Sequence, residues 1–288
     1  MNLLKQRKFT ENLVSDINEI LFKYGIDDEI SIDDITVTEK TVSDLVKPES
    51  KLSNAIINLL WPSIQSAVVY HYTSMEAAES ILSKNIFRLY SIEKNLSDGE
   101  IVTFCERFKL NGYLEKDEKG TPKYETIIAA NTFLGSFTDS EQNLEKDKFL
   151  WKKFATKGGT REGARLKIEI TASYPDFRKM RYHLKDDISI NLLSDIDACI
   201  KKHNREFIFN GISKLCSFYL PEECLIQNEY RILYRSLQGS MLQPKNDGDY
   251  DFIELPIGTN SKNGYDLKIL EVYAEKQLKM DNKYPFVK

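Results

Sequence analysis

The chain has 288 residues, of which 41% are hydrophobic and 29% are charged, so it can bury a full core and its composition does not favour disorder. Its net charge of −4 conceals an asymmetry: residues 151–205 hold 13 Lys and Arg against 7 Asp and Glu, a local excess of +6. Such a segment could attract the phosphates of a dinucleotide or a nucleic acid, and a solvated helix face rich in lysine explains the same count.

The sequence lacks the features that would direct a protein to a membrane, out of the cell or to a metal. No run of about 18 apolar residues occurs, and no apolar segment follows the basic residues near the N-terminus, so the sequence predicts a protein that is neither exported nor in a membrane. The cysteines form no C-x-x-C pair and show no zinc-like spacing, which predicts reduced, mostly buried thiols in a cytoplasmic protein without a metal site. They are Cys105, Cys199, Cys216 and Cys224.

The segment 1–66 is predicted to be a helical N-terminal extension. Apolar residues at helical spacing predict an amphipathic helix over 9–24, and short helices are expected over 43–46 and 53–60. This stretch shows no recognisable chemistry. It is expected to cap the main domain, with a docking surface for a regulator as the alternative.

A strand, helix, strand unit follows. The apolar run 67–73 predicts a strand, Ser74 has the residue type and position of a helix N-cap, and residues 86–90 predict a second strand. His71 ends the first strand with Thr73 beside it. A single His at a strand end is usually structural unless a second feature points to the same place. A helix over 98–109 and a charged loop over 114–123 are expected next.

The apolar segment 124–139 ends in a strand with a distinctive face. Ser136 and Thr138 alternate on one side and Phe137 is expected to face outward on the other. Two hydroxyls and an aromatic ring suit a site that stacks a ring and binds a carboxamide or phosphate, as they suit an ordinary half-exposed strand. A helix over 144–156 should follow. The glycine-rich segment 157–163 lacks the spacing of a phosphate-binding loop or a dinucleotide fingerprint.

The basic segment ends in a predicted helix over 192–204. His183 and His203 have no partner at metal-ligand spacing and are interpreted as surface or structural residues. The remaining predicted elements are strands over 164–170, 250–257 and 267–273, and a polar tail over 280–288.

Glu229 is an isolated carboxylate at the mouth of a predicted strand over 230–235. If the backbone is extended there, Gln227 points the same way as Glu229. A carboxylate can stabilise positive charge or accept a proton, and an amide can orient a nucleophile. An exposed Glu on a strand edge would look the same.

Three separated segments together resemble a known group. They are Tyr-His-Tyr-Thr-Ser at 70–74, Gly-Ser-Phe-Thr at 135–138 and Asn-Glu-Tyr-Arg-Ile at 228–232. In this order the chain, over about residues 67–275, resembles a bacterial family of domains of unknown function and, through it, the ADP-ribosyltransferase superfamily. The resemblance implies an α+β fold with split, mostly antiparallel β-sheets and flanking helices, with residues 67–288 as the catalytic domain.

The resemblance also implies roles for individual residues. His71 would hydrogen-bond a ribose hydroxyl of NAD, Ser136 and Thr138 would support the nicotinamide pocket, Glu229 would be the catalytic acid, and Gln227 would help to select the acceptor. A first-motif His with Ser-x-Thr and Gln-x-Glu mixes the patterns of two classes in the superfamily. The full predicted site consists of the NAD-binding residues His71, Tyr72, Thr73, Ser136, Phe137 and Thr138 and the catalytic residues Gln227 and Glu229.

The implied activity is ADP-ribosyl transfer from NAD, used as a substrate, to a macromolecule. Breaking the nicotinamide–ribose bond builds an oxocarbenium-like cation that a nearby carboxylate stabilises without a metal. The basic segment slightly favours RNA or DNA over protein as acceptor. A toxin or anti-phage defence effector with an antitoxin or regulator is expected.

Two alternatives stay open: an NAD glycohydrolase, and a non-catalytic nucleotide-binding or interaction module on the same fold. Two observations would count against catalysis. These are His71 and Glu229 on opposite sides of the molecule, or Glu229 closed off by an internal ion pair.

Overall fold

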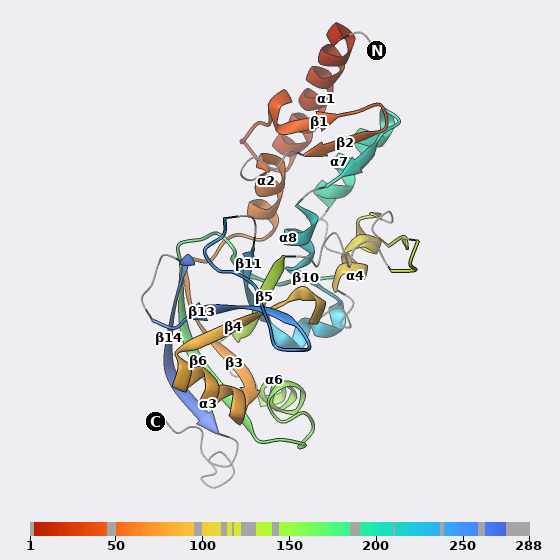
Figure 1. Cartoon of the computed structure of the whole chain (residues 1–288). Coiled ribbons are helices and arrows are strands. Elements are labelled where there is room, and N and C mark those ends of the chain that lie inside the picture. Colours follow the sequence, from red (N-terminus) through yellow and green to blue (C-terminus); the bar gives the residue numbers. More distant parts are fainter. Residues whose placement is uncertain are drawn as a thin grey trace.

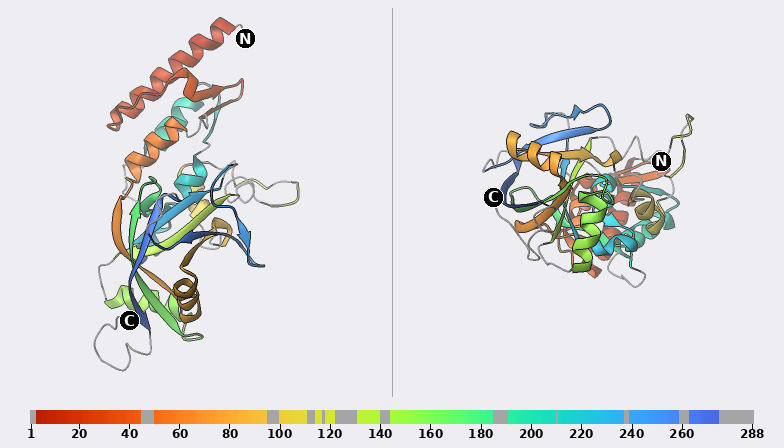
Figure 2. Two further views of the ribbon diagram at one scale, coloured as in Figure 1. Left: turned by 60° about the vertical axis from the view of Figure 1, so that its left-hand side comes forward. Right: turned by 90° about the horizontal axis from the view of Figure 1, so that it is seen from below.

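The computed structural model describes residues 3–44, 50–94, 100–110, 114–116, 118–121, 131–139, 144–184, 191–209, 211–236, 239–258 and 263–274. The molecule has a helical upper part, which contains α1 (Leu3–Lys23), α2 (Lys51–Leu60) and α7 (Asn191–Lys202), and a lower part built on a large sheet (Figure 1). The left view of Figure 2 shows the same division from a second side. Within the described ranges, no helix has both the length and the apolarity needed to cross a membrane.

The upper part joins the beginning of the chain to its second half. α1 buries Leu13, Ile17 and Leu21, which recur at every fourth position and so share one face, and it packs against α7. The hydrophobic cluster to which they belong continues into α4 (Glu100–Arg107) and α8 (Ile212–Cys216). The N-terminal segment therefore shares one core with elements that follow much later in the sequence.

A small sheet in this part corrects one prediction. β1 (Ile35–Val37) pairs antiparallel with β2 (Thr41–Asp44), and β2 pairs parallel with β9 (Glu206–Ile208). The helix predicted over 43–46 is therefore wrong for Ser43 and Asp44, because the partner strand β9 comes from the second half of the chain and leaves no local signal. Residues 45–46 lie outside the described residues.

In the described residues, the lower part is a nine-stranded sheet whose neighbouring strands are antiparallel, which confirms the α+β class. Its main path is β12 (Lys245–Asn246), β13 (Asp251–Pro256), β4 (Ile86–Ser91), β5 (Thr132–Asp139), β3 (Ser66–Ser74), β6 (Gly163–Ala172) and β14 (Tyr265–Ala274). β11 (Glu229–Arg235) branches from β5 and also pairs with β7 (Phe177–Lys179). A separate two-stranded sheet pairs β8 (Arg181–Tyr182) with β10 (Tyr219–Leu220).

The sheet splits at β5. One edge of β5 pairs with β11 continuously from Thr132 to Thr138. The other edge is shared: Phe133 and Leu134 pair with β4, whereas Thr138 and Asp139 pair with β3. Along this second edge, the strand pairings found in the described part leave the stretch 135–137 between β4 and β3. The split opens there.

Most predicted elements are confirmed. The strand predictions correspond to β3, β4, β6, β11, β13 and β14, and the helix predictions over 9–24, 53–60, 98–109 and 192–204 to α1, α2, α4 and α7. Ser74 caps α3 (Met75–Lys84), and its side chain accepts a hydrogen bond from the Ala77 N–H. The described parts of the predicted loop over 114–123 contain no helix or strand. Residues 98–99, 122–130 and 280–288 lie outside the described residues.

The predicted helix over 144–156 is two elements, α6 (Leu144–Leu150) and a π-helical turn η4 (Trp151–Ala155). Such π-turns are rare and often occur beside functional sites. η4 packs against both β3 and β6, so it forms a wall at the split.

Gly163 sets the distance between η4 and β6. A Cβ at this position would lie 2.7 Å from the Ala155 Cβ and 3.0 Å from the Ala155 carbonyl carbon. We expect Gly163→Ala to lower the free energy of unfolding by about 1–3 kcal/mol, since it overpacks this contact. Urea unfolding would measure it, and Ala155→Gly in the same chain should recover part of the loss. If the two substitutions change the free energy of unfolding in a strictly additive way, the proposed contact between residues 155 and 163 is contradicted.

All four cysteines lie within the described ranges, and they are thiols rather than disulfides. The predicted burial is confirmed for Cys105, Cys199 and Cys216, whereas Cys224 is partly exposed.

Candidate functional site

A small pocket of about 80 Å³ lies where β3, β5 and β11 meet. Seven of the eight predicted site residues line it, although they come from three widely separated segments, 71–72, 136–138 and 227–229. The exception is Thr73, which is placed opposite Ala164 of β6. The lining residues are Tyr70, His71, Tyr72, Ser136, Phe137, Thr138, Leu150, Phe154, Gln227 and Glu229.

Strand register explains why these segments meet. Tyr70 pairs with Thr138, and Thr138 pairs with Glu229, so the three residues form one row across β3, β5 and β11. Residues directly opposite one another share a face of the sheet. His71 starts on the other face, but β3 leaves β5 after Tyr70. Its imidazole therefore lies in the split and reaches the same pocket as Glu229.

His71 occupies the gap in the edge of β5. Its Nδ1 donates a hydrogen bond to the Ser136 carbonyl at 2.9 Å, and its ring packs against Phe87 at 4.9 Å and Phe137 at 5.7 Å. Burial lowers the pKa of His71; the Ser136 carbonyl opposes this shift and the charge of Lys94 adds to it. A neutral ring with its proton on Nδ1 keeps a lone pair on Nε2, an acceptor suited to a ligand hydroxyl.

We expect the His71 imidazole to titrate below pH 6.5, its ordinary value. Because its folded pKa is lowered, the unfolded chain binds this proton first, so the His71 contribution to stability is lost as pH falls below 6.5. Imidazole ¹⁵N chemical shifts against pH would measure the midpoint. Lys94→Met should move the midpoint upward, since it removes a like charge. A midpoint at or above 6.5 in the unaltered protein would contradict this account.

Glu229 is not the isolated carboxylate that the sequence suggests. It is only 4% exposed, and its carboxylate accepts hydrogen bonds from Arg231 Nε at 2.6 Å and Nη2 at 3.4 Å. Arg231 also donates to both oxygens of Glu100, at 2.6 and 2.7 Å, and to the Ser217 carbonyl at 2.7 Å. The internal ion pair that would count against catalysis is therefore present, while His71 and Glu229 do share a pocket.

The Glu100–Arg231–Glu229 triad is a buried cation between two carboxylates. Burial alone would lower the pKa of Arg231, but the charges of Glu100 and Glu229 raise it well above its usual range. The Glu229 N–H donates to the Tyr182 hydroxyl at 2.8 Å, which fixes the start of β11. Burial raises the pKa of Tyr182.

Gln227 reaches the pocket by a different route from the one predicted. It ends a 3₁₀-helix (Glu222–Gln227), and Asn228 has a left-handed backbone with φ of 42°. The condition of an extended backbone between Gln227 and Glu229 is therefore not met. Thr138 Oγ1 donates to the Gln227 carbonyl at 2.6 Å, so this strand hydroxyl holds the corner against β5.

Phe137 corrects another expectation. It is 3% exposed and stacks on Phe87 with centroids 5.2 Å apart and planes at 27°, so it packs in the core rather than facing outward to hold a ligand ring. Tyr72 donates its hydroxyl to Asp147, accepts from Arg165 Nη1 at 3.4 Å, and sets its ring edge-on to Trp151. Burial raises the pKa of Tyr72.

Sequence reasoning missed several residues at this site. Arg231 could have been found, because a residue two positions after Glu229 on a strand lies on the same face. Glu100, Tyr182 and Phe154 carry no local signal, since the fold brings them from distant segments.

The charge of Lys94 acts on His71, and Lys94 itself has further cations near it. Lys94 has Arg88, Lys157 and Arg161 within electrostatic range, with Asp247 as an opposing charge. Desolvation lowers the pKa of Lys94, Asp247 raises it and the three cations lower it further. This arrangement suits a phosphate.

Part of the basic excess of residues 151–205 is internal. Arg165 and Arg178 are both 0% exposed, and they pair with Asp147 at 2.7 Å and Asp176 at 3.5 Å. Only the exposed members of the segment can attract a polyanion.

Comparison with models of protein families, with curated proteins and with solved structures found no match to this chain. Any functional proposal for this chain therefore depends on the geometry of the pocket and the chemistry of its residues.

The pocket volume limits what can bind in this conformation. A water takes about 30 Å³ of liquid, so 80 Å³ suits a few waters, whereas pockets for small molecules usually span about 300–1,000 Å³. The pocket that His71 and Glu229 line is therefore too small for a dinucleotide in this conformation. A larger groove of about 850 Å³ follows α1 and residues 26–32, and no predicted site residue lines it.

Proposed function

We propose that the pocket between β3, β5 and β11 binds NAD and transfers ADP-ribose to a macromolecule. One observation carries this proposal: His71, Ser136, Thr138, Gln227 and Glu229, together with Tyr72 and Phe137, line one pocket at the split of an antiparallel sheet. The topology suits the ADP-ribosyltransferase-like arrangement of split sheets that the resemblance implies.

The proposed chemistry assigns one task to each group. The bond between C1′ of the ribose and nicotinamide breaks, and nicotinamide leaves with the electron pair. Glu229 stabilises the cation that develops at C1′ and accepts a hydrogen bond from the ribose 2′-hydroxyl. The acceptor attacks C1′ and releases a proton. His71 Nε2 accepts a hydrogen bond from a ribose hydroxyl, and the cations around Lys94 bind the pyrophosphate.

Catalysis requires a more open state than the one described. Arg231 makes two short hydrogen bonds to Glu100 that do not involve Glu229, so it can stay in place while the Glu229 carboxylate turns toward the ribose. Leu150 and Phe154 form the wall that must move to admit the dinucleotide. Movement of η4 together with the end of α6 would supply this space.

A second candidate is a non-catalytic nucleotide-binding or interaction module. The Arg231–Glu229 ion pair and the pocket volume favour it, because both leave Glu229 engaged inside the protein. In such a module the triad only stabilises the junction of α4 and β11.

The acceptor class is part of the proposal. Lys152, Lys153 and Lys157 are exposed on and just after η4, which supplies Phe154 to the pocket, so a polyanion such as RNA could approach there. A protein acceptor is the alternative. Unregulated, this activity would be toxic to the cell that produces the protein. It therefore fits a toxin or anti-phage effector that an antitoxin or regulator inhibits.

The test is incubation of the full chain with NAD labelled in the adenylate part, with and without cell extract. Label on a macromolecule supports the proposal, and separate digestion with nuclease and protease identifies the acceptor class. Release of free ADP-ribose alone would indicate a glycohydrolase. Binding of NAD without turnover in any extract would establish the second candidate.

A further inference from the structure

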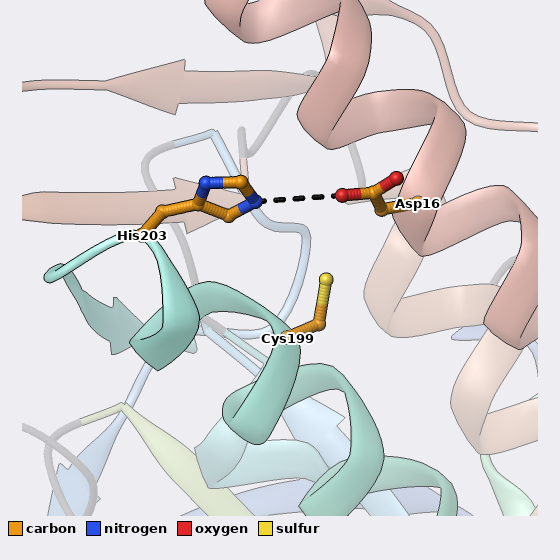
Figure 3. A group of neighbouring side chains, drawn as sticks. All are labelled: Asp16, Cys199 and His203. Carbon is orange, nitrogen blue, oxygen red and sulfur yellow. Dashed lines mark hydrogen bonds and ion pairs between the residues drawn. The ribbon is translucent and has the colours of Figure 1, made fainter.

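A cluster of possible metal ligands lies at the contact between α1 and α7, in the upper part of the molecule. Asp16 of α1, Cys199 of α7 and His203, just after the end of α7, each bring one ligand atom to within 4.8 Å of the other two (Figure 3). None of them lines the pocket between β3, β5 and β11.

The spacing of Cys199 and His203 favours chelation. Cys199 lies in the last turn of α7 and His203 in the turn directly after it, and their thiol and imidazole come within 4.8 Å of each other. The sequence contains Cys-x-x-x-His at 199–203, a spacing that the interpretation of His203 as a surface or structural residue did not consider. Asp16 supplies the third ligand from the facing helix.

The distances approach those of a tetrahedral site. His203 Nε2 and Asp16 Oδ2 lie 3.4 Å apart. Two ligands at about 2.0–2.1 Å from a zinc ion in tetrahedral geometry lie about 3.3 Å apart. The Cys199 sulfur lies within 4.8 Å of both of these atoms, and a zinc–sulfur bond is about 2.3 Å long.

The surroundings fix two of the ligands and leave the site open on one side. The His203 ring packs edge-on against Phe9, with centroids 5.2 Å apart, and Cys199 is buried under α1. Asp16 is 49% exposed in its side chain and His203 30%, so an ion can enter from solvent. The charges facing Cys199 are Asp16, Glu19 and Lys202.

We propose that Asp16, Cys199 and His203 bind a divalent transition metal, with Zn²⁺ preferred and water as the fourth ligand. A thiolate, an imidazole and a carboxylate form a donor set that zinc accepts. Binding exchanges waters of the hydrated ion for three protein ligands, keeps one water on the ion, and releases the Cys199 thiol proton to solvent. The ion ties the N-terminal helix to the second half of the chain, and its binding stabilises this contact. A hydrogen-bonded Asp16–His203 pair without a metal is the competing interpretation.

Cobalt is the direct probe, because a thiolate bound to Co²⁺ gives a strong charge-transfer absorption in the near ultraviolet. We expect this band when one equivalent of Co²⁺ is added to the reduced full chain after chelator treatment, and we expect Zn²⁺ to remove it. Cys199→Ser should abolish the band. The matched controls Cys224→Ser, which changes the partly exposed thiol, and His183→Gln should keep it.

Affinity for Zn²⁺, measured by competition with a chromophoric chelator, should fall on the order of tenfold or more in Asp16→Asn and in His203→Asn. The histidine variant keeps Cys199, so it also tests the site if Cys199→Ser fails to fold. The proposal is overturned if the unaltered protein binds less than one equivalent, or if Cys199→Ser keeps the charge-transfer band.

Discussion

Glu229→Gln is expected to lower the rate of NAD consumption by about 100-fold or more, the usual effect of losing one charge that stabilises a transition state. Gln keeps the size and one acceptor oxygen of Glu, so the pocket keeps its shape. Only the negative charge beside the developing cation is lost. Initial rates with labelled NAD would measure the effect.

Glu100→Gln is the matched control. Both variants remove one carboxylate from Arg231, whose hydrogen bonds to Glu100 are 2.6 and 2.7 Å long. Glu229 lines the pocket and Glu100 is not among its lining residues. A catalytic role requires a large loss of rate in Glu229→Gln alone. Equal rates in the two variants, at similar loss of stability, would reduce Glu229 to a structural ion-pair partner.

Arg231→Met should lower the free energy of unfolding by about 3–5 kcal/mol, because it leaves two carboxylates buried without their cation. The Arg231 and Glu100 side chains are 3% and 2% exposed, and that of Glu229 is 5% exposed, so water cannot replace the lost partner without rearrangement. Urea unfolding at pH 7 would measure the loss.

The pH dependence of this variant has a definite sign. Two buried carboxylates without a cation cost more free energy when charged than when neutral, and low pH favours the neutral form in the variant. Its stability should therefore recover relative to the unaltered protein as pH is lowered. Adding Glu100→Gln and Glu229→Gln should restore most of the loss at pH 7. A variant that loses less than about 1 kcal/mol would show that the triad is solvated rather than buried.

The periodicity of the chain was enough to predict most elements. Apolar residues at spacings of three and four mark α1 and α7, a short apolar run marks β3, and alternation of apolar and basic residues marks β11. Ser74 is a local signal of the same kind, since its hydroxyl caps a helix that begins at the next residue.

The order of three short motifs was also enough to nominate residues that converge on one pocket. It did not reveal how each side chain is engaged there. Phe137 turns into the core because it stacks on Phe87. Gln227 ends a 3₁₀-helix because the left-handed backbone of Asn228 separates it from the strand.

The amino-acid sequence by itself therefore determined the class of the fold, the faces of its elements and the kinds of side chain that meet at the split. The tertiary structure alone decided that Glu100 reaches Arg231 from a distant helix, that β2 pairs with β9, and that Asp16 faces Cys199. Such contacts depend on which distant surfaces bury one another most favourably, and that free energy belongs to the whole chain rather than to any local pattern.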